Sequence, residues 1–157
     1  MSLKEKLIKN STIAFTATLE DSKIFTKKDT IPTTVPMINV ALSGSVDGGL
    51  VPGITMLAGP SKHFKTGFAL LMASAFLKKY SDGVILFYDS EFGTPQSYFN
   101  TFGIPFDAVV HTPVMDVEQL KFDIMKQLTA IERGERVMIV IDSIGNLASK
   151  KEVEDAL

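Results

Sequence analysis

The hydrophobic positions in the larger, second part of the chain alternate between two periods, which predicts a mixed α/β domain. Three short runs are apolar along almost their whole length, at 54–58, 84–90 and 137–143, and the last two end in polar residues. Strands of this kind are buried on both faces, as in a parallel sheet between helices. Residues 65–79 and 116–133 instead carry apolar side chains at helical spacing. The alternation favours a doubly wound sheet.

Shorter signals lie between these elements. Residues 94–102 are predicted to form a short helix, with Thr94 as its cap and Pro95 in its first turn. A brief strand is expected at 108–112, and Asp116 is placed to cap the long helix that follows. In parallel sheets ligands bind at the carboxyl ends of the strands, and the unusual polar residues of this chain fall at those ends.

The N-terminal part has a different character. Residues 2–10 carry apolar side chains at helical spacing behind a capping serine, whereas residues 11–36 are rich in threonine and lack strong periodicity. We expect an extended arm there. Residues 36–53 hold four glycines among apolar residues, which predicts a turn-rich lead-in to the core. We therefore divide the chain into a helix and arm, 1–35, and a core, 36–157.

Composition narrows the class of protein without identifying it. The chain has 157 residues, enough for one domain with a substantial core, and is 45% hydrophobic. Its net charge is −2, so there is no basic excess of the kind that marks many nucleic-acid-binding proteins. It has no cysteine, which excludes disulfides and thiolate metal sites. Without an apolar stretch of about 18 residues, we expect a cytoplasmic protein and no membrane partner.

The sequence GPSKHFKT, residues 59–66, is close to a phosphate-binding loop and lies between a predicted strand and a predicted helix. The pattern G-x-x-x-x-G-K-[ST] is met by Gly59, Lys65 and Thr66, but Phe64 replaces its second glycine. Such loops bind phosphate through backbone N–H groups and the helix N-terminus. The lysine neutralises the outer phosphates and the hydroxyl binds Mg²⁺. The alternative is an ordinary turn that happens to carry a lysine.

Carboxylates follow the other two apolar runs. Asp142 comes directly after MIVI, where related sites place a carboxylate beside Mg²⁺, and the adjacent Ser143 could bond phosphate, water or only the backbone. Asp89 and Glu91 are two residues apart, so an extended chain would put both side chains on one side. Glu91 is the candidate to orient an attacking water. A solvated acidic turn or a helix cap is the alternative for this pair.

Four further residues have two interpretations each. Tyr98 could stack on an adenine ring or pack against the neighbouring phenylalanines. Lys62 and His63 could reach a phosphate, but exposure on a loop explains them equally well. His111 has no second histidine nearby in the sequence, so we expect a hydrogen-bonded residue at a strand end and not a metal ligand.

The chain resembles the RecA-type recombinases, and more closely the branch found in T-even phages. The resemblance is carried by ALSGSVDGGLVPGITMLAGPSKHFKT (41–66), LFYDSEFGTP (86–95), HTPV…EQL (111–120) and AIERGERVMIVIDSIGNLASKKE (130–152). In that branch a phenylalanine also precedes the loop lysine. Phe64 is then a feature of the branch, tolerable if its position does not need a positive φ.

The resemblance implies a RecA-like P-loop ATPase core with a parallel sheet, which uses ATP and Mg²⁺. Glu91 and Lys65 would be catalytic, with Glu91 activating water, and Thr66 and Asp142 would bind Mg²⁺. The implied ATP-binding residues are Gly59, Pro60, Ser61, Lys62, His63, Phe64, Lys65, Thr66, Tyr98 and Ser143.

The resemblance also implies partners. The family assembles into helical filaments on single-stranded DNA and exchanges homologous strands in recombination and repair, as a DNA-dependent ATPase. Residues 1–35 would dock on the next protomer, and residues 36–157 would form the N-terminal part of the ATPase core. If phage-encoded, the protein would act in the host cytoplasm.

One departure from the family concerns length. We expect the family's DNA-binding loops to come after Leu157. The strand that in this fold lies between strands 54–58 and 137–143 in the sheet would also come after Leu157, so this chain alone would have a gap in its sheet. The alternative function is a truncated, non-catalytic homologue that binds or caps recombinase filaments. A generic ATPase or kinase is disfavoured, because no acceptor-binding acid or arginine can be identified.

Overall fold

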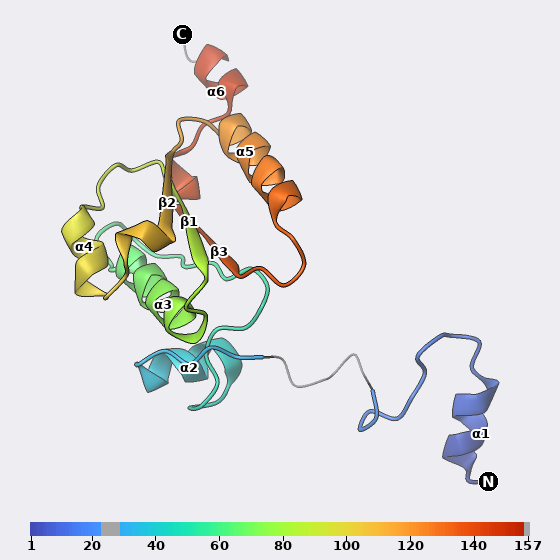
Figure 1. Cartoon of the computed structure of the whole chain (residues 1–157). Coiled ribbons are helices and arrows are strands. Elements are labelled where there is room, and N and C mark those ends of the chain that lie inside the picture. Colours follow the sequence, from blue (N-terminus) through green and yellow to red (C-terminus); the bar gives the residue numbers. More distant parts are fainter. Residues whose placement is uncertain (23–28, 156–157) are drawn as a thin grey trace.

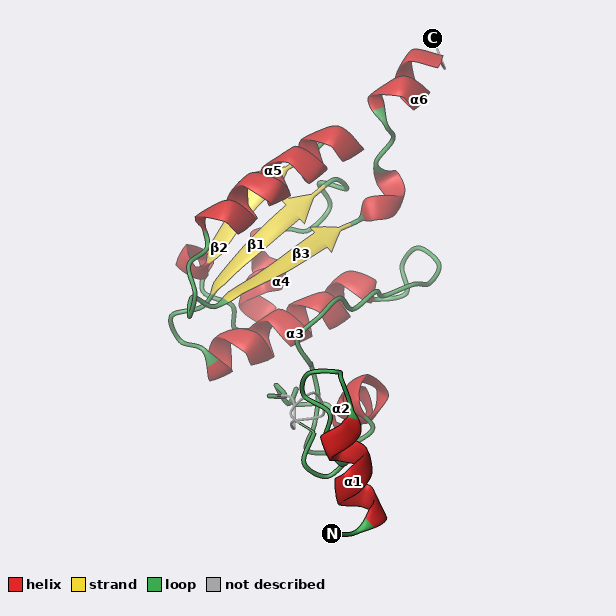
Figure 2. Cartoon of the chain, turned by 90° about the vertical axis from the view of Figure 1, so that its right-hand side faces the viewer, coloured by secondary structure: helices red, strands yellow, loops and turns green. Residues whose placement is uncertain are grey.

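The computed structural model describes residues 1–22 and 29–155 and confirms the predicted α/β class. Three parallel strands form one sheet in the order β2-β1-β3: β1 is Val84–Asp89, β2 is Val109–Pro113 and β3 is Val137–Asp142. Helices cover both faces of the sheet (Figure 2). The predicted strands at 84–90, 108–112 and 137–143 are therefore confirmed to within one residue at each end.

The central strand β1 organises the core. Its side chains alternate, with Ile85 and Phe87 in one apolar cluster and Leu86 and Tyr88 in the other, as the two-residue period of a strand requires. All four are at most 7% exposed. Each such burial contributes roughly 1.5–3 kcal/mol, so β1 is the most strongly fixed part of the sheet.

Helix α3, Lys65–Lys79, packs on the face of the sheet that carries Phe87, as its sequence pattern predicts. Its Leu70 is fully buried there. Helix α5, Val117–Ala130, lies on the opposite face (Figure 2). Asp116 caps α5 by accepting a hydrogen bond from the Gln119 N–H at 2.7 Å, so that prediction is confirmed.

The helical spacing of apolar residues in 116–133 predicts the burial and the length of α5 only in part. Leu120 is buried, but Leu128 is 50% exposed and the helix ends at Ala130, three residues before the predicted end. A hydrogen bond holds the middle of α5 against the sheet, because the Tyr88 hydroxyl donates to Asp123 Oδ2 at 2.7 Å. Burial, and this bond to a carboxylate, raise the pKa of Tyr88. The contact joins α5 to the central strand.

Two local predictions are only partly correct. Residues 36–53 contain a helix, α2 (Pro36–Ser43), which begins with proline in its first turn and ends at Gly44 with a φ of 74°. The short helix α4, Gln96–Thr101, has Pro95 at its N-cap without a side-chain cap, so Thr94 is not the predicted cap. The glycines of 36–53 favoured turns over a helix in the sequence pattern. The Thr94 hydroxyl instead contacts a carboxylate in the candidate site, described below.

Residues 54–58 do not form the predicted strand. They have no pairing with the sheet, Ile54 is completely exposed and Met56 is 80% exposed. Strand β3 lies at an edge of the sheet, and no other described segment pairs along it. Because a strand needs a hydrogen-bonded neighbour, an apolar run of five residues is not sufficient to make one.

Helix α1, Leu3–Asn10, begins at the Ser2 cap as predicted, with a capping box between Ser2 and Glu5. It buries none of its residues and lies apart from the sheet (Figure 1). Part of the predicted arm, residues 23–28, lies outside the described residues. The segment that follows is fastened to the core, because Asp29 accepts hydrogen bonds from Lys79 and Tyr80.

The remaining elements are short: 3₁₀ turns at Phe106–Ala108 and Ile144–Asn146, and helix α6 at Lys150–Asp155. No helix in the described ranges is long and apolar enough to span a membrane.

The Tyr88–Asp123 bond should hold α5 on the sheet. We expect Tyr88→Phe to lower the free energy of unfolding by about 1–2 kcal/mol, because it leaves a part-buried carboxylate without its donor. The matched control is Tyr80→Phe, which removes a bond to an exposed carboxylate at 2.8 Å and should cost less than about 1 kcal/mol. Chemical denaturation measures both. Equal losses would contradict a special role for Tyr88.

Candidate functional site

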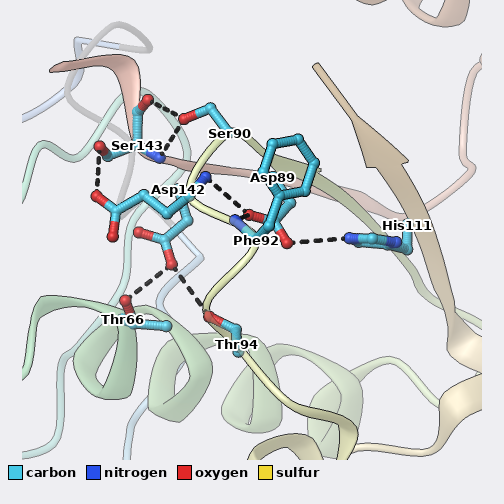
Figure 3. A network of polar contacts seen from close by, with 9 residues as sticks. Thr66, Asp89, Ser90, Phe92, Thr94, His111, Asp142 and Ser143 are labelled. Carbon is cyan, nitrogen blue, oxygen red and sulfur yellow. Dashed lines mark hydrogen bonds and ion pairs between the residues drawn. The ribbon is translucent and has the colours of Figure 1, made fainter. Parts of the chain in front are cut away.

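The candidate site lies where β1 and β3 end beside the N-terminus of α3. The parallel register places Asp89 opposite Asp142, so both strands end at the same level. Asp142 is 8% exposed, and the Thr66 hydroxyl at the start of α3 donates to its Oδ2 at 2.8 Å (Figure 3). Two residues that are 76 positions apart in the sequence are thus joined, as the predicted Mg²⁺ pair requires.

The Asp142 carboxylate is in an unfavourable environment for a negative charge. Burial raises its pKa, and the nearby carboxylates of Glu91 and Asp89 raise it further. Hydrogen bonds from Thr66 and Thr94 oppose this effect only in part. A cation bound beside Asp142 would relieve the desolvation and the repulsion together.

Magnesium fits this donor set better than a transition metal. In the described residues no group of three or more His, Asp or Glu side chains is placed to hold a metal ion. Mg²⁺ is usually bound by one or two carboxylates together with phosphate oxygens and water. Asp142 and the Thr66 hydroxyl can supply the protein's share of such a shell.

Thr94 is a site residue that the sequence analysis missed. Its hydroxyl lies 3.5 Å from Asp142 Oδ2, the same oxygen that accepts from Thr66 (Figure 3). The pattern Thr-Pro suggested a helix cap, and nothing in the sequence links Thr94 to a carboxylate 48 residues later.

Glu91 is held beside the end of β3 by a serine pair. The Ser143 hydroxyl donates to Glu91 Oε1 at 2.8 Å. Ser90 in turn fixes Ser143, since its hydroxyl donates to the Ser143 carbonyl at 2.6 Å and accepts from the Ser143 N–H at 3.0 Å (Figure 3). Ser90 was not singled out by the sequence analysis, although it lies between the two predicted acids.

Asp89 has a positioning role. Its buried carboxylate accepts from the Glu91 N–H at 3.0 Å, the Phe92 N–H at 2.7 Å and His111 Nε2 at 3.2 Å. The chain therefore turns after Asp89, and the expected extended path through Glu91 is wrong. His111 is hydrogen-bonded as predicted, but it is the middle residue of β2 and not a strand-end residue. This network orients the turn that carries Glu91.

The predicted loop residues, 59–66, gather at the N-terminus of α3. Lys65 Nζ donates to the Pro60 carbonyl at 2.9 Å, so the side chain folds back across the loop. His63 Nδ1 lies 3.0 Å from the Ser61 carbonyl, which accounts for His63 without a ligand. Lys62 is exposed and has a φ of 65°. The loop is closed by contacts within itself.

Phe64 has a positive φ, so the condition under which the loss of glycine would be tolerable is not met. It is the N-cap residue of α3 and has a φ of 61°, a conformation that normally favours glycine. Tyr98 lies in α4 and packs edge-on against Phe64, with 6.4 Å between ring centroids, and against Phe102 at 5.6 Å. Packing on phenylalanines is therefore observed for Tyr98, and stacking on adenine stays a prediction.

The raised pKa of Asp142 predicts an effect on stability. Because the folded state holds the proton more tightly than the unfolded chain, the ionised carboxylate lowers stability as the pH rises above its ordinary value of 3.8. We expect Asp142→Asn to raise the thermal midpoint of the ligand-free chain at pH 7 by a few degrees. The gain should shrink as the pH falls toward that value. The exposed Asp107→Asn is the control, and a lower midpoint for Asp142→Asn would refute this assignment.

Comparison with known proteins gives one strong similarity. A scan against models of protein families finds no match. The chain is 54% identical over 155 residues to a protein of Enterobacteria phage T4 called "Recombination and repair protein". The match covers 99% of this chain and 40% of the phage protein. The chain therefore spans about two fifths of the length of that relative.

Proposed function

We propose that this chain carries the ATP-binding part of a recombinase that exchanges DNA strands in homologous recombination and repair. The observation that carries the proposal is the bond from Thr66 to the buried Asp142, beside the loop that contains Lys65. The similarity to the phage T4 protein named for recombination and repair supports the biological role. The site geometry supports the nucleotide chemistry.

ATP would bind with its outer phosphates in the loop 59–66. Backbone N–H groups at the start of α3 and the helix dipole favour a negative ligand there. Lys65 would exchange its internal acceptor, the Pro60 carbonyl, for phosphate oxygens. Tyr98, on the neighbouring helix α4, would contact the adenine ring.

Magnesium would be held by Thr66 and Asp142. When bound, it neutralises charge on the phosphates and fixes their orientation. In this chain the Thr66 hydroxyl and the Asp142 carboxylate already lie 2.8 Å apart.

Glu91 would orient the water that attacks the outer phosphate. Its carboxylate is exposed on one side and bonded to Ser143 on the other, so one oxygen remains available for a water molecule. Asp89 fixes the backbone of the same turn through two N–H groups. Positioning of this kind contributes typically 10²–10⁴-fold to a proton-transfer step.

Assembly on single-stranded DNA would use the N-terminal arm for contacts between copies. In the described part of the arm, six large apolar side chains are at least 63% exposed: Met1, Leu3, Leu7, Ile13, Phe15 and Leu19. Docking on the next protomer would bury them. If phage-encoded, the protein would act in the host cytoplasm. A non-catalytic role in capping filaments is the competing function, and intact Lys65 and Glu91 favour the catalytic one.

Lys65→Ala tests the proposed site. In a protein that contains this chain and turns over ATP in the presence of single-stranded DNA, we expect the variant to lose at least about 100-fold in turnover, because the phosphates lose their fixed positive charge. Lys78→Ala, an exposed lysine at the other end of the same helix, is the control. Unchanged turnover by Lys65→Ala would overturn the assignment.

Glu91→Gln separates binding from hydrolysis. We expect Mg·ATP affinity, measured by calorimetry, to stay within a few-fold, while turnover falls by about 10²-fold or more. Loss of binding together with turnover would place Glu91 in the structure of the site and not in the chemistry. A wild-type protein that binds Mg·ATP without turnover would favour the filament-capping function.

A further inference from the structure

We propose that Phe64 is a positioning residue that couples the phosphate loop to helix α4, and that Gly67 is its steric partner. This inference rests on the proposed function for its effect on nucleotide binding. The steric part concerns the fold alone and is testable without a ligand.

The first observation is the backbone of Phe64. Its φ of 61° lies in the left-handed region, which is unfavourable for a residue with a bulky side chain. The phosphate-loop pattern has glycine here, the residue that adopts this conformation most readily. Contacts of the side chain must therefore offset the strain.

The second observation is Gly67, one turn into the same helix. A Cβ built on Gly67 would lie 2.4 Å from two atoms of the Phe64 ring, Cε1 and Cζ, and 2.7 Å from Cδ1. Glycine inside a helix is itself unfavourable relative to alanine. Its presence at a buried position is explained by the ring, which occupies the space that a side chain would need.

Three other aromatic rings contact the Phe64 ring, and these contacts hold the ring beside Gly67 although Phe64 is 53% exposed. Its centroid lies 5.6 Å from that of Phe68, 6.4 Å from that of Tyr98 and 6.3 Å from that of Phe102. The first two contacts are edge-on, a favourable geometry for aromatic pairs. Tyr98 belongs to α4 and Phe102 is the residue that caps its C-terminus.

These contacts connect the two ends of the nucleotide site. The backbone of Phe64 directly precedes Lys65, and its ring contacts the helix that carries the candidate adenine-binding Tyr98. A glycine at position 64 could adopt the same backbone conformation but would have no side chain to contact α4. Phe64 therefore transmits the position of α4 to the loop, and Gly67 makes the necessary space.

A double-mutant cycle on the full 157-residue chain tests the steric pair. We expect Gly67→Ala to lower the thermal midpoint, because the new methyl group collides with the ring. In the Phe64→Gly background the same change should be neutral or raise the midpoint, since the ring is gone and alanine is the better helix former. Equal effects of Gly67→Ala in both backgrounds would overturn the pairing.

Ligand binding tests the positioning role. The probes are Mg·ATP and inorganic triphosphate with Mg²⁺, which occupies the loop but has no base. We expect Phe64→Gly to weaken Mg·ATP and to reduce the preference for ATP over triphosphate by about two- to tenfold, as loss of aromatic contacts would. Phe106→Gly, an exposed phenylalanine outside the cluster, should leave the preference unchanged.

The outcomes distinguish this inference from the proposed function. If the wild-type chain binds neither probe, the proposed function and the positioning role both fail, and the unfolding cycle still decides the Phe64–Gly67 pair. If the wild-type binds ATP and Phe64→Gly keeps the full preference for ATP, the positioning role alone is wrong.

Discussion

The buried carboxylate of Asp142 is the constraint on which the rest of the site depends. Parallel pairing of β3 with β1 brings it level with Asp89, and burial between a sheet and a helix leaves its charge poorly solvated. The hydroxyl of Thr66 ties it to the first turn of α3. One interaction therefore sets the distance between the phosphate loop and the strand ends, and it leaves a position that favours a cation.

The loop 59–66 shows how a departure from a sequence motif can be accommodated. Its second glycine is replaced by Phe64, yet the left-handed backbone remains, and a glycine at position 67 accommodates the ring. The aromatic cluster with Tyr98 and Phe102 then gives the loop a connection to α4.

Much of the fold could be predicted from periodicity, since the patterns of α3 and β1 are set by which faces they bury. The acids at the strand ends could be predicted for the same reason. The pairing of strands could not be predicted in this way. Residues 54–58 have a strand-like composition, but no described segment pairs with them. The role of Thr94 also could not be predicted from a local pattern, because its contact with Asp142 joins two segments that are 48 residues apart.

A crystal structure of the chain with Mg²⁺ and a non-hydrolysable ATP analogue tests the central claim most directly. The account predicts phosphates in the loop 59–66, Lys65 turned from the Pro60 carbonyl toward them, and Mg²⁺ beside Thr66 and Asp142. An analogue bound elsewhere, with Lys65 still on Pro60 and no ion near Asp142, would contradict it.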